Sequence, residues 1–80
     1  MAQTNYREMK RKLESRTTFN GNSARAVIDG EHYLVYSYNT LILKWNIRAQ
    51  AQVYFNAARY SSTTSRLQNM IRAAFNVQES

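Results

Sequence analysis

The stretch SARAVIDGEHYLVY, residues 23–36, constrains the fold more than any other part of the chain. Two runs of strand-forming residues flank Asp29 and Gly30, and Asp-Gly is among the strongest sequences for a two-residue hairpin turn. We therefore predict an antiparallel hairpin in which small residues of the first strand face large residues of the second. The predicted register pairs Ala26 with Tyr33 and Ala24 with Val35. These residues share a face that we expect to lie under a helix, while the opposite face meets solvent.

The segment after the hairpin contains two further candidate strands. A turn is predicted at Asn39-Thr40, and apolar residues then alternate along residues 41–47, with Leu41, Leu43, Trp45 and Ile47 on one side. Residues 52–56, QVYFN, are predicted to form a fourth short strand with Val53 and Phe55 on one face. Because sequential strands with short connections usually pair, we predict a four-stranded antiparallel meander over residues 22–56.

Apolar spacing predicts a helix near the N-terminus. Tyr6, Met9 and Leu13 recur at helical intervals and form one narrow apolar stripe over residues 5–15. The other sides of this helix are basic, and the cations include Arg7, Lys10, Arg11 and Lys12. We leave two interpretations open: a solvated helix packed by one stripe, or a basic helix that contacts phosphates or an acidic partner.

A second helix is predicted near the C-terminus, where the apolar stripe is broader. It spans residues 62–76, crosses one face of the sheet, and buries Leu67, Met70, Ile71, Ala74 and Phe75. We expect the core to contain Trp45, Leu43, Leu67, Ile71 and Phe75. The predicted fold class is therefore α+β, with a basic N-terminal helix in residues 1–18 and a single small α+β domain in residues 19–80.

Composition argues against catalysis. The 80 residues include no cysteine, which excludes disulfides, zinc-cysteine sites and thiol nucleophiles. His32 is the only histidine, and the five acidic residues form no spaced pair for acid–base chemistry or metal binding. We therefore expect no enzymatic activity, no metal and no cofactor.

Charge and hydropathy predict the localisation of the protein and the class of its binding partner. Eleven Lys and Arg against five Asp and Glu give a net charge of +6, which favours nucleic acid or an acidic protein surface as a partner. No run of residues has the length and apolarity of a membrane span, and charges stand where a signal peptide would be apolar. We expect a cytoplasmic protein with no membrane partner.

The stretch RYSSTTSRLQNMI, residues 59–71, contains five consecutive hydroxyl side chains at the start of the second predicted helix. Ser and Thr oxygens bond the free amides of a first helical turn, so one or two of Ser61, Ser62 and Thr63 are expected to act as caps. A helix start with spare hydroxyls and flanking arginines also suits an anion. We favour the cap and keep the anion site as the alternative.

Three blocks of the sequence, FNGNSARA, YLVYSYNTLI and RYSSTTSRLQNMI, resemble a family of short, uncharacterised bacteriophage and prophage proteins. That family shares an F-x-G-x-S strand, a Y-S-Y-x-T-x-I strand pair and a Y-S-x-T-T-S-R/K-x-Q-N helix start. The similar region runs from residue 19 to residue 74, with the blocks in the same order. The resemblance implies a phage accessory protein, in the cytoplasm of an infected bacterium, with four strands followed by a helix. It implies no activity, cofactor or site.

These features support binding functions of different classes. We favour a small accessory protein that binds and inhibits a host or anti-phage-defence protein, since Tyr and Arg dominate interface hot spots and the chain has six tyrosines. The alternative is a nucleic-acid-binding protein that uses the basic helix and the strand aromatics. A weaker alternative is an oligomeric sponge for a small anionic signal, which would use the hydroxyl-rich helix start.

The residues expected to contact a partner or an anion are basic, aromatic or hydroxyl-bearing. They are Arg7, Lys10, Arg11, Lys12, Arg25, Tyr36, Tyr38, Arg59, Tyr60, Thr63, Thr64 and Arg66. Oligomeric state stays open between monomer and homodimer. Apolar side chains beyond those that one sheet face and one helix can cover would favour the dimer, namely Leu34, Tyr36, Ile42 and Tyr54.

Overall fold

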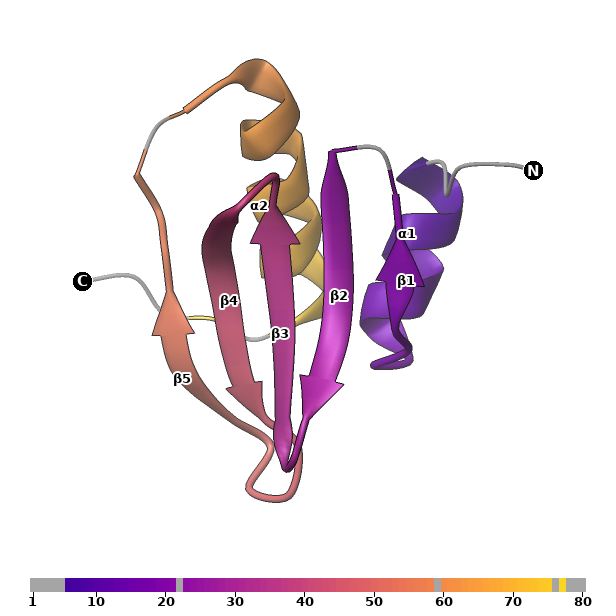
Figure 1. Ribbon diagram of the computed structural model, residues 1–80, viewed down its shortest axis with the longest axis vertical. Helices are drawn as coiled ribbons and strands as arrows, with labels where there is room; N and C mark the ends of the chain where they lie inside the picture. The colour runs from indigo at the N-terminus through magenta and orange to yellow at the C-terminus, as the bar shows by residue number, and fades with distance from the viewer. Residues whose placement is uncertain (1–5, 22, 59, 76, 78–80) are drawn as a thin grey trace.

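The computed structural model describes residues 6–21, 23–58, 60–75 and 77, which form an α+β fold with two helices behind one antiparallel sheet (Figure 1). The elements in chain order are α1 (Tyr6–Glu14), β1 (Phe19–Asn20), β2 (Ala24–Asp29), β3 (His32–Ser37), β4 (Thr40–Asn46), β5 (Ala51–Phe55) and α2 (Ser62–Ala74). The predicted class, the two helices and the antiparallel meander are confirmed.

The sheet has five strands in the order β1-β2-β3-β4-β5, so the predicted number of four was wrong. The additional strand is β1, in which Phe19 pairs with Ala26 and Asn20 pairs with Arg25. Burial of the Phe19 side chain, which is 6% exposed, holds β1 against the sheet. Two residues are too few to show a period-two pattern, which is why the sequence did not reveal this strand.

The β2–β3 hairpin forms with a register two residues away from the predicted one. Asp29 pairs with His32, so the loop is Gly30-Glu31 rather than Asp29-Gly30, and Ala26 lies opposite Val35. Gly30 has a φ of 63° and is the loop residue with positive φ, as in turns that place glycine first. A shift of two residues keeps every side chain on its face, so the predicted division into a covered and an open face holds.

The covered face of the sheet forms the core with one side of each helix. A continuous row of cross-strand partners spans all five strands and contains Phe19, Ala26, Val35, Leu43 and Phe55. The helices contribute Met9 and Leu13 from α1 and Leu67, Ile71 and Phe75 from the α2 region. All five predicted core residues are buried, with Trp45 at 6% exposed and Leu43 at 0%.

Two bulges change the predicted alternation in β4 and β5. Val35 pairs with Leu43 while Tyr36 pairs with Leu41, so Ile42 is an extra residue and is fully buried beside Leu43. The expected surplus of apolar surface at Ile42 is therefore absent. In β5 the extra residue is Val53, which is 52% exposed and does not share the burial of Phe55. Bulges of this kind let two neighbouring residues escape strict alternation.

Arg16 joins the C-terminal ends of the two helices. The chain leaves α1 through a left-handed residue, Arg16 at φ 55°, whose N–H donates to the Leu13 carbonyl over 3.2 Å. The Arg16 Nη1 also donates to the carbonyl oxygens of Leu13 at 3.0 Å, Glu14 at 3.1 Å and Ala74 at 3.3 Å. Its guanidinium carbon lies 3.7 Å from the ring centroid of Phe75. One cation thereby serves the negative ends of both helix dipoles.

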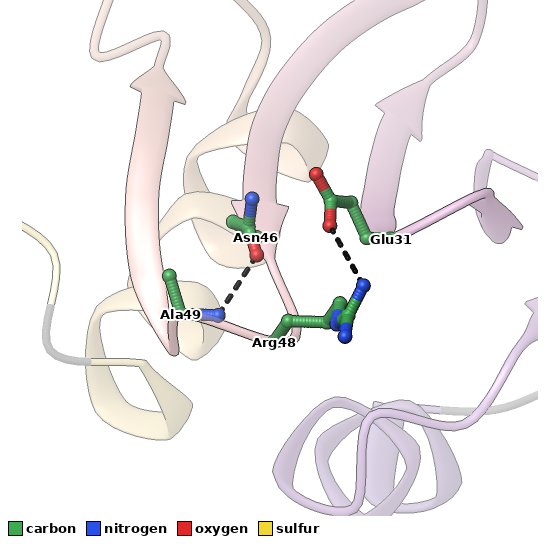
Figure 2. Close-up of polar contacts among 4 residues, drawn as sticks. All are labelled: Glu31, Asn46, Arg48 and Ala49. Atoms are coloured by element: carbon green, nitrogen blue, oxygen red, sulfur yellow. Dashed lines mark hydrogen bonds and ion pairs between the residues drawn. The ribbon is translucent and has the colours of Figure 1, made fainter.

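Polar contacts within and between the β2–β3 turn and the β4–β5 loop hold one end of the sheet, opposite the β3–β4 turn (Figure 2). Asn46 Oδ1 accepts from the Ala49 N–H at 2.9 Å and shapes the β4–β5 loop. Arg48 and Glu31 form an ion pair at 4.0 Å, with side chains that are 83% and 46% exposed. Exposed pairs of this kind contribute little, because water already solvates both charges. This end of the sheet is therefore organised by backbone geometry more than by charge.

Candidate functional site

Within the part of the chain that the structure describes, both helices lie on the same side of the sheet and leave the other side uncovered (Figure 1). Strand pairing places three rows of side chains on this uncovered side. One row runs from Arg25 through Tyr36 to Leu41, and the second from Val27 through Leu34 and Lys44 to Tyr54. The third row runs from Asp29 through His32 and Asn46 to Ala51. We call this surface the open face, and it consists of Arg25, Val27, Asp29, His32, Leu34, Tyr36, Leu41, Lys44, Asn46, Ala51 and Tyr54.

The open face exposes a patch of apolar and aromatic surface. Val27 and Tyr54 are 38% and 44% exposed, and Leu34, Tyr36 and Leu41 between them are half-buried. These five residues belong to four adjacent strands, so they form one continuous patch rather than scattered single side chains. Contiguous apolar surface on a small protein marks an interaction site more often than isolated exposed residues do.

Arg25 and Tyr36 form a stacked pair at the centre of the first row. The Arg25 guanidinium carbon lies 4.6 Å from the centroid of the Tyr36 ring, within range of a cation–π contact. Arg25 Nη1 also donates to the Tyr38 carbonyl oxygen at 3.4 Å. These contacts fix the direction of the guanidinium on an otherwise solvated surface, which reduces the entropy that it would lose on binding.

The electrostatic character of the open face is positive. Arg25 and Lys44 are its two cations, and neither has an acidic cross-strand partner: Arg25 pairs with Asn20 and Tyr36, and Lys44 pairs with Leu34 and Tyr54. Asp29 lies on the same face opposite His32, at the end of β2 beside the turn, so the face carries two cations and one carboxylate. A surface with this distribution attracts an acidic partner and repels a basic one.

The basic helix lies away from the open face. Arg7, Lys10 and Arg11 are exposed and Lys12 is half-buried, on an α1 that packs on the covered side of the sheet. A nucleic-acid surface that combines the basic helix with the strand aromatics, as the alternative prediction supposed, would thus have to reach around the edge of the sheet. The structure does not bring these two predicted groups together.

The hydroxyl run begins α2, and its N-cap is Ser61. The Thr64 N–H donates to Ser61 Oγ at 3.3 Å, and Ser62 is the first residue of the helix. Thr64 is 3% exposed, and its hydroxyl lies 2.8 Å from that of Ser37 on β3. Thr63 is half-buried. The predicted cap is therefore confirmed at Ser61. The run also anchors α2 to the sheet through Thr64, which the sequence did not predict.

A pocket of about 250 Å³ lies between the β3–β4 turn and the start of α2, and it gathers three of the predicted contact residues, Tyr38, Tyr60 and Thr64. Its other lining residues are Ser37, Thr40 and Ser61. Arg66 is exposed on α2 and does not line the pocket, and Arg59 lies outside the described residues. Because the Thr64 hydroxyl is bonded inside the protein, the predicted anion site loses one of its donors.

Strand alternation was a signal that could have found the residues missing from the predicted set. Lys44 stands between Leu43 and Trp45, two residues predicted to be buried, so it had to point away from the core. Tyr54 precedes Phe55 in the same way. The predicted set concentrated on charge clusters and on the hydroxyl run, and it included Arg25 and Tyr36 but omitted these two neighbours.

Two features, a cluster of metal-ligating side chains and a membrane-spanning helix, do not occur among the described residues. These residues include no group of three His, Asp or Glu side chains that could hold a metal ion. The described helices are also too short and too polar to cross a membrane.

Comparisons with known protein families, with characterised proteins and with solved structures found no match. The resemblance to short phage proteins stays a prediction based on three sequence blocks. The second and third of these blocks contain all the residues that line the pocket beside α2. Their hydroxyl groups have an internal use there, because the contact between Ser37 and Thr64 fastens the sheet to the helix.

Proposed function

We propose that this is a small non-enzymatic protein that binds an acidic surface of another protein through its open face and thereby blocks that surface. The observation that carries the proposal is the uncovered patch of five apolar and aromatic side chains, next to which lie Arg25 and Lys44. Apolar burial would supply affinity at about 25 cal/mol per Å² removed from water. The two cations would supply orientation and exclude basic partners.

The composition of the patch suits protein recognition. Tyrosine and arginine are enriched among interface hot spots, and Tyr36, Tyr54 and Arg25 lie on adjacent rows of the same face. Each tyrosine offers a large rigid ring with few rotatable bonds, so little conformational entropy is lost when it is buried. The resemblance to phage accessory proteins makes a host or anti-phage-defence protein, in the cytoplasm of an infected bacterium, the proposed target.

The proposal is tested by reversing one charge on the open face and, as a control, one charge on α1. Wild-type protein, Lys44→Glu and Lys10→Glu are immobilised and exposed to host lysate treated with nuclease. We expect one acidic protein to be retained by wild type and by Lys10→Glu, because Lys10 lies on α1 behind the sheet. Lys44→Glu should weaken binding of that purified protein at least about tenfold, or about 1.4 kcal/mol. Equal retention by all three proteins would refute a role for the open face.

The same face supports a second candidate function, binding of single-stranded nucleic acid. Tyr36 and Tyr54 offer rings on which bases could stack, and Arg25 and Lys44 lie beside them to contact phosphates. This version needs the open face alone and no contribution from α1. It predicts that retention is lost after nuclease treatment and that the affinity for a labelled single-stranded oligonucleotide falls steeply with salt. A partner that survives nuclease favours the protein-binding proposal instead.

A further inference from the structure

We propose that a second copy of this chain pairs with the outer edge of β5, so that two five-stranded sheets join into one ten-stranded sheet about a two-fold axis. The contact uses the backbone edge of β5, a strand that also carries the open-face residue Tyr54. The test variants at Val53 leave every open-face residue unchanged, so the pairing and the proposed function can fail separately.

Each copy offers one edge that is long enough for this pairing. Residues Ala51–Phe55 of β5 pair with β4 on one side, and no described strand lies on the other side (Figure 1). The opposite edge is β1, which has two residues and lies in front of α1. Strand edges present unpaired N–H and C=O groups that another strand can satisfy. With one usable edge per copy, the association closes at two chains and does not grow into a fibre.

The absence of charged side chains along β5 favours a second copy of the chain as the partner of this edge. Residues 49–58 contain no charged side chain, although the whole chain carries +6. When identical strands pair antiparallel, each residue faces another residue of the same strand, so a cationic strand would oppose like charges. The β5 edge avoids that repulsion. It also lacks the lysine or proline with which many edge strands prevent such pairing.

The open face lacks this self-compatibility. If two copies packed face to face, each would bring Arg25 and Lys44 against a face that carries the same two cations and a single carboxylate, Asp29 at the strand end. A second copy therefore fits the edge, whereas an acidic protein fits the face. The β5 edge and the open face are therefore expected to bind different partners, because the edge is uncharged and the open face is positive.

The register of the pair follows from the exposed side chains of β5. Val53 is 52% exposed at the bulge and Tyr54 is 44% exposed. An axis through Val53 pairs that residue with its own copy, Gln52 with Tyr54, and Ala51 with Phe55. The area buried by one strand pair is small, so we expect a concentration-dependent dimer rather than an obligate one.

Sedimentation equilibrium with two lysine variants tests the proposal. We expect wild type and Val27→Lys to dimerise with rising concentration, because Val27 lies on the open face away from β5. Val53→Lys should remain a monomer with an unchanged circular dichroism spectrum, because it places a lysine against its copy. Wild type that stays monomeric up to millimolar concentration would overturn the proposal. Loss of the dimer in Val27→Lys and not in Val53→Lys would also overturn it.

A cysteine variant keeps the test valid if Val53→Lys fails to fold. The chain has no cysteine, so a single one reports only its own position. Residues directly opposite in an antiparallel pair have Cα atoms about 4.5–5.5 Å apart, within the range that a disulfide spans. Under mild oxidation, Val53→Cys should form a covalent dimer and Val27→Cys should stay mostly monomeric. Equal cross-linking of the two variants would contradict the edge pairing.

Discussion

At its N-terminal end α2 is held by neutral hydroxyl and amide groups, whereas its C-terminal end is held by a guanidinium and aromatic rings. Near the N-terminus, Thr64 bonds Ser37 over 2.8 Å and Gln68 Nε2 donates to the Asn56 carbonyl oxygen at 2.7 Å. Beyond the last turn, Arg16 stacks on Phe75 and donates to the Ala74 carbonyl oxygen. The two ends should therefore respond differently to mutation and to pH.

The difference reflects the polarity of a helix. The first amides of α2 need acceptors, and a serine or threonine oxygen nearby in sequence can supply one. The last carbonyls need donors and carry partial negative charge, so a cation is the better partner. At this end the cation comes from residue 16, which is 58 positions away from its acceptor Ala74. The N-terminal amides of α2 thus find acceptors nearby in the sequence, whereas a C-terminal carbonyl of α2 finds its donor only through the tertiary fold.

The largest expected effect is the removal of the aromatic ring at the C-terminal end. Phe75 is 2% exposed, lies 4.9 Å from Trp45 between ring centroids, and stacks with Tyr33. Phe75→Ala should lower the free energy of unfolding by about 3–5 kcal/mol, since it removes buried surface and leaves a cavity. Denaturant titration measures this loss. A change below that caused by Ser61→Ala would mean that the N-terminal end is the more important attachment.

The next effect in size concerns Arg16. Arg16→Ala removes hydrogen bonds from a charged donor to three carbonyls, and we expect a loss of about 2 kcal/mol, in the range for bonds to charged groups. Arg16→Lys keeps the positive charge but lacks the planar guanidinium, which stacks on Phe75 and can donate several hydrogen bonds. Lysine should therefore recover only part of the lost free energy of unfolding. Arg16→Gly serves as the control for the backbone, because glycine adopts the φ of 55° without strain. Full stability of Arg16→Ala would show that the contact to Ala74 does not join the helices.

A smaller effect is expected at the N-terminal end. Ser61→Ala removes the cap and should lower the free energy of unfolding by about 1 kcal/mol. Ser62→Ala is the matched control one residue later. It should be nearly neutral, because Ser62 is already inside the helix, where alanine is favourable. Thermal unfolding of both variants decides between the two positions, and a greater loss in Ser62→Ala would place the cap one residue further along.

The smallest effect under ordinary conditions is the pH dependence of the C-terminal end. Burial raises the pKa of the Tyr33 hydroxyl above its ordinary value, and the charge of Arg16 offsets this only in part. The folded state therefore keeps a proton that the unfolded state releases above pH of about 10. The contribution of the Tyr33 hydroxyl to the free energy of unfolding is fully present below that pH, and it falls as the pH rises further. Tyr33→Phe should show a weaker alkaline decline than wild type in denaturant titrations, and an identical decline would refute the assignment.

The sequence by itself determined the elements whose signals are local. The alternation in residues 23–36 predicted which side chains of the hairpin face the core, and the stripe through Leu67, Ile71 and Phe75 predicted α2. The hydroxyl run predicted a cap, because a capping oxygen must lie within a few residues of the amides that it serves. These features depend on spacing along the chain, which the sequence states directly.

Tertiary structure decided the features that depend on distant residues. The bulges at Ile42 and Val53, the two-residue strand β1, and the hairpin register depend on which partners the neighbouring strands offer. Arg16 finds Ala74 only after α1 and α2 have packed side by side. The open face exists because both helices cover the same side of the sheet. No local pattern in either helix specifies that choice, since an apolar stripe can pack against any apolar surface.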